Sequence, residues 1–387
     1  MNESWMMVSV PTQIIFGVNT NSLVISEIEK MGGKQVFLVT DEGVSRTNFF
    51  MKILDNLNQH GIEVEVFSNV ESDPSVETVE KAFFRFNQKK VFVLLAIGGG
   101  SPMDTAKAIG ILATNGGKIS DYEGINTFNT PPLPLIAIPT TAGTGSEVSG
   151  SCVITDTERG VKMSIRHARL NPARIAILDP LALISLPASL AVYTGMDAFV
   201  HALESYLSLQ ANPLTDGINL YAIELIAKNL RHFVANRNNL EVGGNMLAGA
   251  SLGAIGFSHT GAGNVHCMAR FVGAFFHIPH GLSNAVCLPY AAEFNMSACP
   301  EKFARVAQAL GIETYAMTKI EAARAAISGI KLLCKDIDIP RNLKELGVKE
   351  EAIPKMARLA FQANYNRWNP RYTTEEDFVM LFKKAME

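Results

Sequence analysis

The sequence predicts two domains, an α/β domain with a parallel sheet at residues 1–182 and an all-helical domain at residues 183–387. In the first half, short apolar runs alternate with longer amphipathic stretches. This alternation is typical of βαβ units, whose right-handed crossovers produce a parallel sheet. From about Ser185 onward, apolar residues recur at helical spacing and convincing strand runs are scarce.

The predicted strands are short apolar runs, and the predicted helices have longer periodic patterns. The strands are expected at 35–40, 64–67, 91–97, 135–138 and 175–178. The strand at 91–97 is apolar throughout, which indicates burial on both faces of the sheet. In the second half, the clearest helices are expected at 198–207, 216–233, 301–310, 319–334 and 376–386.

Composition excludes several classes of protein. The chain has 387 residues, of which 48% are hydrophobic and 18% charged, so it can bury a core and is not a disordered chain. With 34 basic and 37 acidic residues, it lacks the positive excess expected of a nucleic-acid-binding protein. Five scattered cysteines without a C-x-x-C pair predict reduced thiols and a cytoplasmic location.

No targeting or membrane segment is predicted. The N-terminus lacks the basic and apolar regions of a signal peptide. The most apolar stretch, 175–192, is interrupted by Asp179, Pro180 and Pro187, which makes it a poor membrane span.

A glycine turn follows the apolar strand at 91–97 directly. It reads Gly98-Gly99-Gly100-Ser101-Pro102-Met103-Asp104. Ser101 is the expected N-cap of the next helix, with Asp104 as a capping acid. Glycines let a ligand approach the backbone, and a helix N-terminus favours a pyrophosphate. The turn is neither G-x-G-x-x-G nor a P-loop, so an ordinary tight turn is the alternative.

Two further features favour a dinucleotide. The hydroxyl-rich run Pro139 to Ser146 follows the strand at 135–138, and ligands bind at the carboxyl edge of open α/β sheets. Asp41 ends the strand at 35–40, where a carboxylate can accept both hydroxyls of an adenosine ribose and repel a 2′-phosphate. This favours NAD over NADP. The alternative is that Asp41 only caps a helix.

Four side chains in the helical half form a candidate metal site. Asp197 and His201 are four residues apart, so a helix places them on one face, and His266 and His280 lie downstream. Three imidazoles and one carboxylate suit Fe(II), Zn(II), Mn(II) or Ni(II). The spacing alone is weak evidence, because a lone helical histidine is more often hydrogen-bonded or exposed.

Five features occur here in the order in which they occur in the iron-containing (group III) alcohol dehydrogenases. They are GGGSPMD, PTTAGTGSE, TGMDAFVHALE, His266 and PHGLSNAVCLP, and the sequence resembles that family over nearly its whole length. The resemblance implies a Rossmann-like NAD-binding domain and a helical domain, as in dehydroquinate synthase-like proteins. It implies a divalent metal and the nicotinamide meeting in a cleft between them, and a homo-oligomer.

Residue roles follow from this resemblance. The implied metal ligands are Asp197, His201, His266 and His280. The implied metal is Fe2+, with Zn2+ or Mn2+ as alternatives. The predicted cofactor-binding residues are Asp41, Gly98, Gly99, Ser101, Asp104, Thr140, Thr141, Thr144, Ser149, Lys162 and Leu178. The implied reaction is hydride transfer between NADH and a small aldehyde, with the metal as Lewis acid on the substrate oxygen.

Two segments depart from the family pattern. The family commonly has a histidine four residues after the third ligand, proposed there to relay a proton or contact the substrate, and this sequence has Arg270. Arginine stays protonated and is a poor proton shuttle, so His277 is the candidate replacement. The segment from Phe257 to Gly263 carries His259 and Ala262, which makes that wall more polar and roomier.

These departures lead to a substrate hypothesis. Arg270, with His259 and Phe257, is expected to bind a sulfonate, carboxylate or phosphonate tail on the aldehyde, because a guanidinium forms a bidentate pair with such groups. Three alternatives stay open. Arg270 pairs with a nearby acid, the substrates are neutral short-chain alcohols and diols, or the chain is an NAD- and metal-dependent lyase or synthase on the same scaffold.

Overall fold

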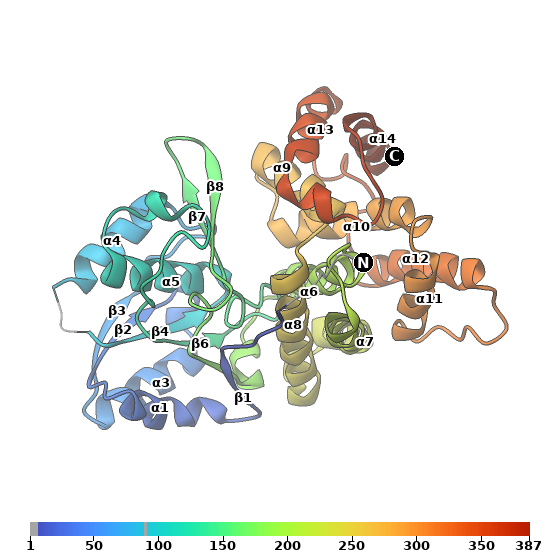
Figure 1. The fold of residues 1–387 in the computed structure, drawn as a ribbon. Coiled ribbons are helices and arrows are strands. Elements are labelled where there is room, and N and C mark those ends of the chain that lie inside the picture. The colour runs from blue at the N-terminus through green and yellow to red at the C-terminus, as the bar shows by residue number, and fades with distance from the viewer. Residues whose placement is uncertain (1–6, 89–90) are drawn as a thin grey trace. The chain divides into compact units, whose positions relative to one another are not determined.

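The computed structural model describes residues 7–88 and 91–387. The chain forms two compact units, Met1–Leu186 and Pro187–Glu387 (Figure 1). Among the described residues, no helix combines the length and apolar character needed to cross a membrane.

The first unit is built on a six-stranded parallel sheet with the order β1-β9-β6-β4-β2-β3. The strands are β1 (Gln13–Phe16), β2 (Gln35–Val39), β3 (Glu63–Phe67), β4 (Val93–Gly98), β6 (Leu135–Pro139) and β9 (Ile175–Leu178). All five predicted strands are confirmed. At the edge of the sheet, β1 pairs in parallel with β9.

Successive side chains of the strands point to opposite faces of the sheet, as the period of two requires. Val36 and Leu38 of β2 join a core with α1 (Val24–Lys30) and α3 (Asn48–Gln59). Phe37 and Val39 join a second core with α4 (Val76–Phe86) and α5 (Gly100–Asn115). Helices therefore cover both faces, which explains why every residue of β4 is buried.

The sheet reverses its winding direction between β2 and β4. These two strands are neighbours, and the helices that follow them, α3 and α5, cover opposite faces. In open α/β sheets, ligands bind outside the carboxyl ends of the strands at such a switch point. Asp41, after β2, and the glycine turn, after β4, are therefore at the edge where a ligand is expected.

A small second sheet was not predicted. It contains β5 (Gly124–Ile125) and the antiparallel hairpin of β7 (Ser151–Asp156) and β8 (Val161–Arg166). Only alternate residues of the hairpin are buried, and the positions between them are mostly polar, so its strands lack the continuous apolar run of β4, β6 and β9. Gly160, with a φ of 65° in the connecting turn, is a further local hairpin signal beside this alternation.

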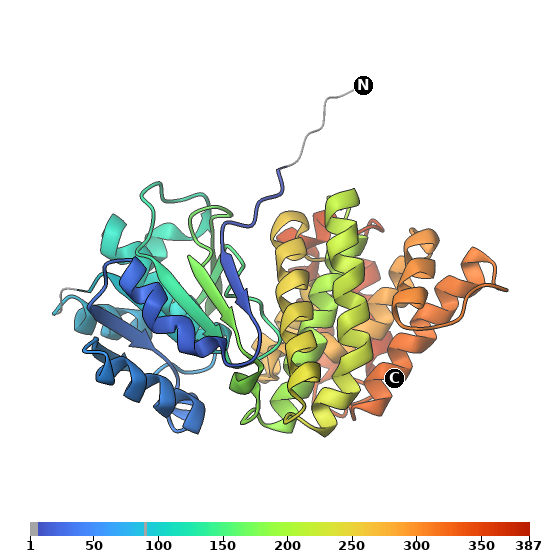
Figure 2. The same cartoon turned by 90° about the horizontal axis from the view of Figure 1, so that it is seen from below.

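The second unit is helical throughout, which confirms the predicted all-helical half. Residues 187–387, all of which the structure describes, contain no strand. Its first three helices pack side by side (Figure 2). The helices are α6 (Ala188–Leu207), α7 (Pro213–Ala235), α8 (Leu240–Thr260), α9 (Asn264–Phe276), α10 (His280–Met296), α11 (Pro300–Ala309), α12 (Lys319–Asp336), α13 (Ile353–Gln362) and α14 (Glu375–Met386).

Short elements complete the chain. α2 (Glu42–Ser45) follows β2. Single 3-10 turns lie at Thr20–Leu23, Ile119–Tyr122, Pro180–Leu183, Glu350–Ala352 and Asn364–Trp368.

Candidate cofactor and metal sites

The glycine turn connects β4 to α5 without room for side chains. A Cβ atom on Gly98 would lie 2.6 Å from the Pro102 ring, and one on Gly100 would lie 2.9 Å from Thr144. α5 begins at Gly100, with Gly99 as a cap that makes no side-chain hydrogen bond. The turn therefore offers backbone N–H groups at a helix N-terminus, which is the arrangement that binds a pyrophosphate.

The expectation that Ser101 caps α5 and that Asp104 completes a capping box is wrong. The helix starts earlier, because the glycines adopt the cap conformation themselves. The Ser101 hydroxyl instead accepts a hydrogen bond from the Asp73 N–H at 3.3 Å. Asp73 also forms an ion pair with Lys162 of β8 at 2.6 Å. The structure thus connects two predicted cofactor residues, Ser101 and Lys162, through Asp73.

Hydrogen bonds connect the carboxyl ends of β2, β4 and β6. The Thr40 hydroxyl donates to the Ile97 carbonyl at 2.7 Å, and the Thr140 N–H donates to the Gly98 carbonyl at 3.0 Å. A Cβ atom on Gly99 would lie 3.4 Å from the Thr141 side chain. The structure therefore brings Thr140 and Thr141 to the glycine turn, as a shared dinucleotide site requires.

Asp104 and Lys107 form a buried pair that anchors the loop after β6. Asp104 accepts hydrogen bonds from the Ser146 hydroxyl at 2.7 Å and from the Val153 N–H at 2.9 Å. Lys107 Nζ donates to Ser146 Oγ at 2.8 Å and to the carbonyls of Ser149 and Ser151 at 3.0 and 2.8 Å. Asp104 thus holds the loop and β7 instead of capping α5.

Burial shifts both members of this pair away from their charged forms. Desolvation raises the pKa of Asp104 and lowers the pKa of Lys107, and their mutual attraction opposes both shifts. Such a pair is costly to break, because removal of one member leaves the other buried and uncompensated.

The remaining predicted cofactor residues have varied surroundings. Asp41 Oδ1 accepts the Val44 N–H at 2.9 Å, so Asp41 does cap α2. Thr144 is exposed and accepts the Ser146 N–H at 3.3 Å, whereas Leu178 is buried at the end of β9. Their contact with a cofactor stays a prediction.

In the second unit, Asp197 and His201 of α6 meet His266 of α9. One candidate ligand atom from each lies within 4.8 Å of the other two, and all three residues are buried. His280 begins α10, and its Nε2 lies 3.7 Å from Asp197 Oδ1, with 42% of its side chain exposed. The structure therefore brings the three predicted histidine ligands close to the fourth ligand, the carboxylate of Asp197.

This donor set fits a divalent cation. It combines one buried carboxylate with imidazole nitrogens, which suit Fe(II), Zn(II) and Mn(II). Although burial acts to raise it, the pKa of Asp197 is lowered by the three histidines and by a hydrogen bond from Asn284. The local charges thus favour the ionised carboxylate that a metal needs.

Sequence reasoning missed two residues of this site. Asn284, one turn after His280, donates to Asp197 Oδ1 at 2.7 Å. Glu204, three residues after His201 on α6, contacts His266 Nδ1 at 2.6 Å. Both lie at helical spacing from a predicted ligand, which is the signal that could have identified them.

The residues proposed for substrate binding are distributed around α8 and α9. The Phe257 ring lies 4.8 Å from the His201 ring, between centroids, so Phe257 does border the cluster. His259 is in the last turn of α8 and His277 ends α9 with a φ of 54°. Tyr365, which was not predicted, places its ring 6.3 Å from that of His266.

Arg270 lies one helical turn after His266 on α9 and is half-buried. Its guanidinium carbon is 5.9 Å from the Phe271 ring centroid. The spacing of four residues puts Arg270 on the same face of α9 as His266.

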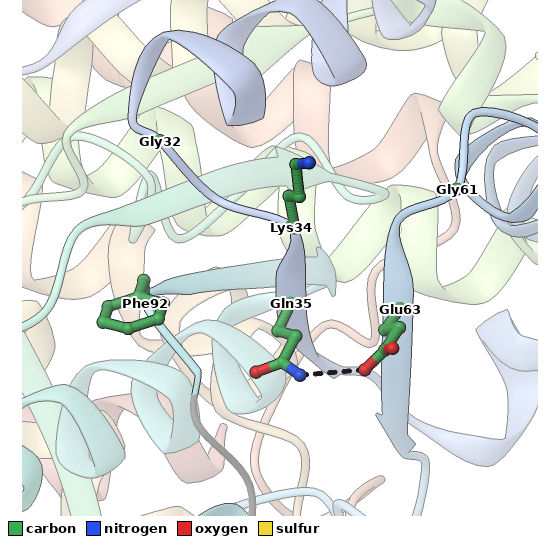
Figure 3. Close-up of a pocket in the computed structure, with 6 residues that line it drawn as sticks. All are labelled: Gly32, Lys34, Gln35, Gly61, Glu63 and Phe92. Atoms are coloured by element: carbon green, nitrogen blue, oxygen red, sulfur yellow. Dashed lines mark hydrogen bonds between the residues drawn. The ribbon is translucent and has the colours of Figure 1, made fainter.

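A cavity of about 420 Å³ lies at the opposite edge of the sheet from the glycine turn (Figure 3). It is lined by Gly32, Lys34, Gln35, Gly61, Glu63 and Phe92. Gln35 and Glu63, which form a 2.9 Å hydrogen bond there, are the first residues of β2 and β3. Because the strands are parallel, this amino-terminal cavity is separate from the candidate dinucleotide site.

A glycine turn at a switch point and a buried Asp/His cluster are the features expected of a dinucleotide- and metal-dependent enzyme. Residues 11–180 match the family "Iron-containing alcohol dehydrogenase", and residues 191–386 match "Fe-containing alcohol dehydrogenase family, C-terminal". The chain belongs to the iron-containing alcohol dehydrogenase family.

Individual relatives agree with this assignment. The chain is 41% identical over 378 residues to a 1,3-propanediol dehydrogenase of Klebsiella pneumoniae, with 97% of each chain covered. It is 36% identical over 377 residues to an NAD-dependent methanol dehydrogenase of Bacillus methanolicus, covering 97% of this chain and 99% of the other. A crystal structure of a 1,3-propanediol oxidoreductase superposes with a TM-score of 0.96 at 40% identity. The match covers 99% of this chain and 100% of the other.

These comparisons confirm the predicted family and fold class. The chain is an NAD-dependent alcohol dehydrogenase or aldehyde reductase, and its family uses NAD and a divalent metal, usually Fe2+. The lyase or synthase alternative finds no support in these relatives.

We expect Lys107→Met to destabilise the first unit by about 3–5 kcal/mol, because Asp104 then stays buried without its cation. The loop after β6 also loses its anchor, so NADH binding should weaken. Urea unfolding and NADH fluorescence titration measure the two effects.

Two variants control this prediction. Asp104→Asn combined with Lys107→Met removes both charges and should recover part of the stability. Lys81→Met, on the exposed face of α4, should change neither quantity. Wild-type stability in Lys107→Met would show that the pair does not anchor the loop.

Proposed function

We propose that this enzyme interconverts a small aldehyde carrying an anionic tail and the corresponding alcohol, with NAD as the hydride carrier. A sulfonate, carboxylate or phosphonate is the proposed tail. The observation that carries the proposal is the position of Arg270, one turn from His266 on the same face of α9.

The proposed metal ligands are Asp197, His201, His266 and His280. A divalent metal bound there would supply a Lewis acid for the substrate oxygen, and NAD would exchange the hydride. One carboxylate among three imidazoles leaves such a site net positive, which suits an oxygen that gains negative charge. Burial of three of these ligands excludes water from their side of the site.

The proposed dinucleotide site uses the carboxyl edge of the sheet in the first unit. The backbone at Gly98, Gly99 and Ser101 would bind the pyrophosphate. Asp41 would accept hydrogen bonds from the adenosine ribose while its Oδ1 caps α2. This arrangement supports NAD as the preferred cofactor, because a 2′-phosphate would meet a carboxylate.

Arg270 supports an anionic tail through the chemistry of its side chain. A guanidinium presents a planar fork that pairs bidentately with carboxylate or sulfonate oxygens. Its place next to His266 along α9 would leave two or three carbons between the tail and the reacting carbon.

A neutral diol is the second candidate substrate. The relative at 41% identity is named for 1,3-propanediol, whose second hydroxyl is uncharged. A guanidinium can also donate to such a hydroxyl, but this neutral contact is weaker than a charge-assisted pair.

Removal of the metal tests the redox assignment. We expect dialysis against a chelator to abolish NADH oxidation with short aldehydes, and added Fe2+, Zn2+ or Mn2+ to restore it in part. The measurement is the absorbance of NADH, with NADH binding by fluorescence as the control for an intact first unit. Full activity without metal would contradict the proposal.

Arg270→Ala tests the substrate class. We expect kcat/KM for an aldehyde with an anionic tail to fall by about 10–10²-fold, the loss expected when one partly buried charge-assisted pair of about 1.5–3 kcal/mol is removed. A neutral aldehyde of equal length should change less than tenfold. Arg324→Ala, at an exposed position of α12, is the matched control. Equal losses with both aldehydes would contradict the anionic tail.

Asp41→Asn tests cofactor choice without loss of the helix cap, because asparagine caps helices as well as aspartate does. We expect the preference for NADH over NADPH to decrease at least tenfold, since the 2′-phosphate no longer meets a negative charge. Steady-state kinetics with both cofactors measure it, and unchanged thermal stability confirms that the cap is retained.

A further inference from the structure

The side chain of Glu204 connects two helices of the second unit at the candidate metal site. It extends from α6 to the first turn of α9, and only 4% of the residue is exposed. Burial of a carboxylate is costly unless its oxygens accept hydrogen bonds, so its partners indicate why it is there.

Three donors converge on this carboxylate. Oε1 accepts the Val265 N–H at 2.6 Å, and Oε2 accepts the Gly263 N–H at 2.9 Å. The third donor is His266 Nδ1, at 2.6 Å from Oε2. Both oxygens are therefore used, and all three donors belong to four consecutive residues.

Glu204 replaces the missing cap of α9. Gly263 is the N-cap residue and has no side chain to cap the helix. A side chain would not fit at this position, because a Cβ atom on Gly263 would lie 2.9 Å from Asn369 Oδ1 and 3.0 Å from Glu204 Oε1. The carboxylate of another helix thus satisfies the backbone donors and interacts favourably with the helix dipole.

Asn369 holds the same turn from its other side. Its Oδ1 accepts the Asn264 N–H at 3.2 Å, and it exchanges side-chain hydrogen bonds with Asn295 at 2.9 and 2.7 Å. The first turn of α9 is therefore held between α6, α10 and the segment before α14. His266 lies in this fixed turn.

The contact with Glu204 also sets the tautomer of His266. A carboxylate accepts hydrogen bonds, so the proton of the neutral imidazole is on Nδ1 and the lone pair is on Nε2. Nε2 is then the atom available to a cation. In metalloproteins, a carboxylate that orients a histidine in this way changes metal affinity about 10–100-fold.

We infer that Glu204 is a positioning residue that fixes the orientation and tautomer of His266 for metal binding. This inference rests on the proposed function, because it assumes that His266 is a ligand. It explains why a carboxylate is buried beside the cluster instead of an apolar side chain.

Glutamine at this position cannot reproduce the three contacts. Its amide has one acceptor oxygen and one donor NH2 group. In one orientation the NH2 group faces the Val265 N–H, and in the other it faces Gly263 and His266. The first orientation opposes one donor and leaves His266 an uncharged acceptor, whereas the second opposes two donors, His266 among them. Glu204→Gln should therefore disturb the first turn of α9 in either orientation, and it replaces the charge-assisted contact to His266 by a neutral one at best.

The test is metal affinity of the metal-free full chain, titrated with Zn2+ alone and measured by calorimetry. We expect Glu204→Gln to weaken Zn2+ binding about 10–100-fold. The visible spectrum of the Co2+-loaded variant should also change, because the spectrum reports the ligand geometry. NADH binding, which uses the first unit, should stay within twofold of wild type.

Thr374→Ala is the matched control for loss of a helix cap. Thr374 caps α14 through its side chain, so this variant loses a cap in the same unit without touching His266. It should lower thermal stability and leave Zn2+ affinity and the Co2+ spectrum unchanged. If Glu204→Gln behaved like Thr374→Ala, the positioning role would be overturned.

The outcomes of the Zn2+ titration distinguish failure of this inference from failure of the proposed function. If the wild-type chain bound no Zn2+, the proposed metal site would fail. If wild type and Glu204→Gln bound Zn2+ equally, only the positioning role of Glu204 would fail. If Glu204→Gln did not fold, Glu204→Asp, which keeps the charge but shortens the side chain, should weaken Zn2+ binding by more than Thr374→Ala does. Equal affinity in Glu204→Asp and Thr374→Ala would overturn the inference.

Discussion

The second unit depends on partners for the polar side chains that α6 buries on one face. Asp197, His201 and Glu204 follow each other at spacings of four and three residues, so one face of a buried helix carries all three. Burial of such groups is unfavourable unless other elements supply donors or charges. Asn284 of α10 supplies a donor for Asp197, and the first turn of α9 supplies three for Glu204. The positions of α9 and α10 are thus coupled to the candidate ligands.

The first unit uses a buried pair in the same way. Lys107 donates hydrogen bonds to two carbonyls and one hydroxyl of the segment 146–151. Asp104 accepts hydrogen bonds from that hydroxyl and from a backbone N–H of β7. Apolar packing cannot fix an irregular glycine- and threonine-rich loop, because such a loop has few side chains to bury. Directional hydrogen bonds from a rigid helix can fix it, at the cost of desolvating two charges.

Local patterns determined which features were predictable. Four of the five predicted strands are largely apolar, the fifth alternates apolar residues with Glu65, and the helical half has clear periodicity, so these features follow from short windows of sequence. The hairpin of β7 and β8 was missed because its buried residues alternate with mostly polar ones, so no continuous apolar run marks either strand. Glu204 and Asn284 were missed because their partners lie 62 and 87 residues away in the chain. The start of α5 was misplaced because glycines adopt the cap conformation without a polar side chain.

The difference between buried and partly buried positions explains why the reaction class is easier to infer than the substrate. Several candidate cofactor and metal residues, among them Ser149, Asp197 and His266, are buried and hydrogen-bonded, so one change there leaves other groups unsatisfied. Arg270, His259 and Phe257 are only partly buried, so substitutions there disturb fewer contacts. Such positions can change while the scaffold and its hydride chemistry stay the same. A relative at 41% identity therefore supports the redox reaction class, whereas the proposed substrate rests on a few side chains near the end of α8 and along α9.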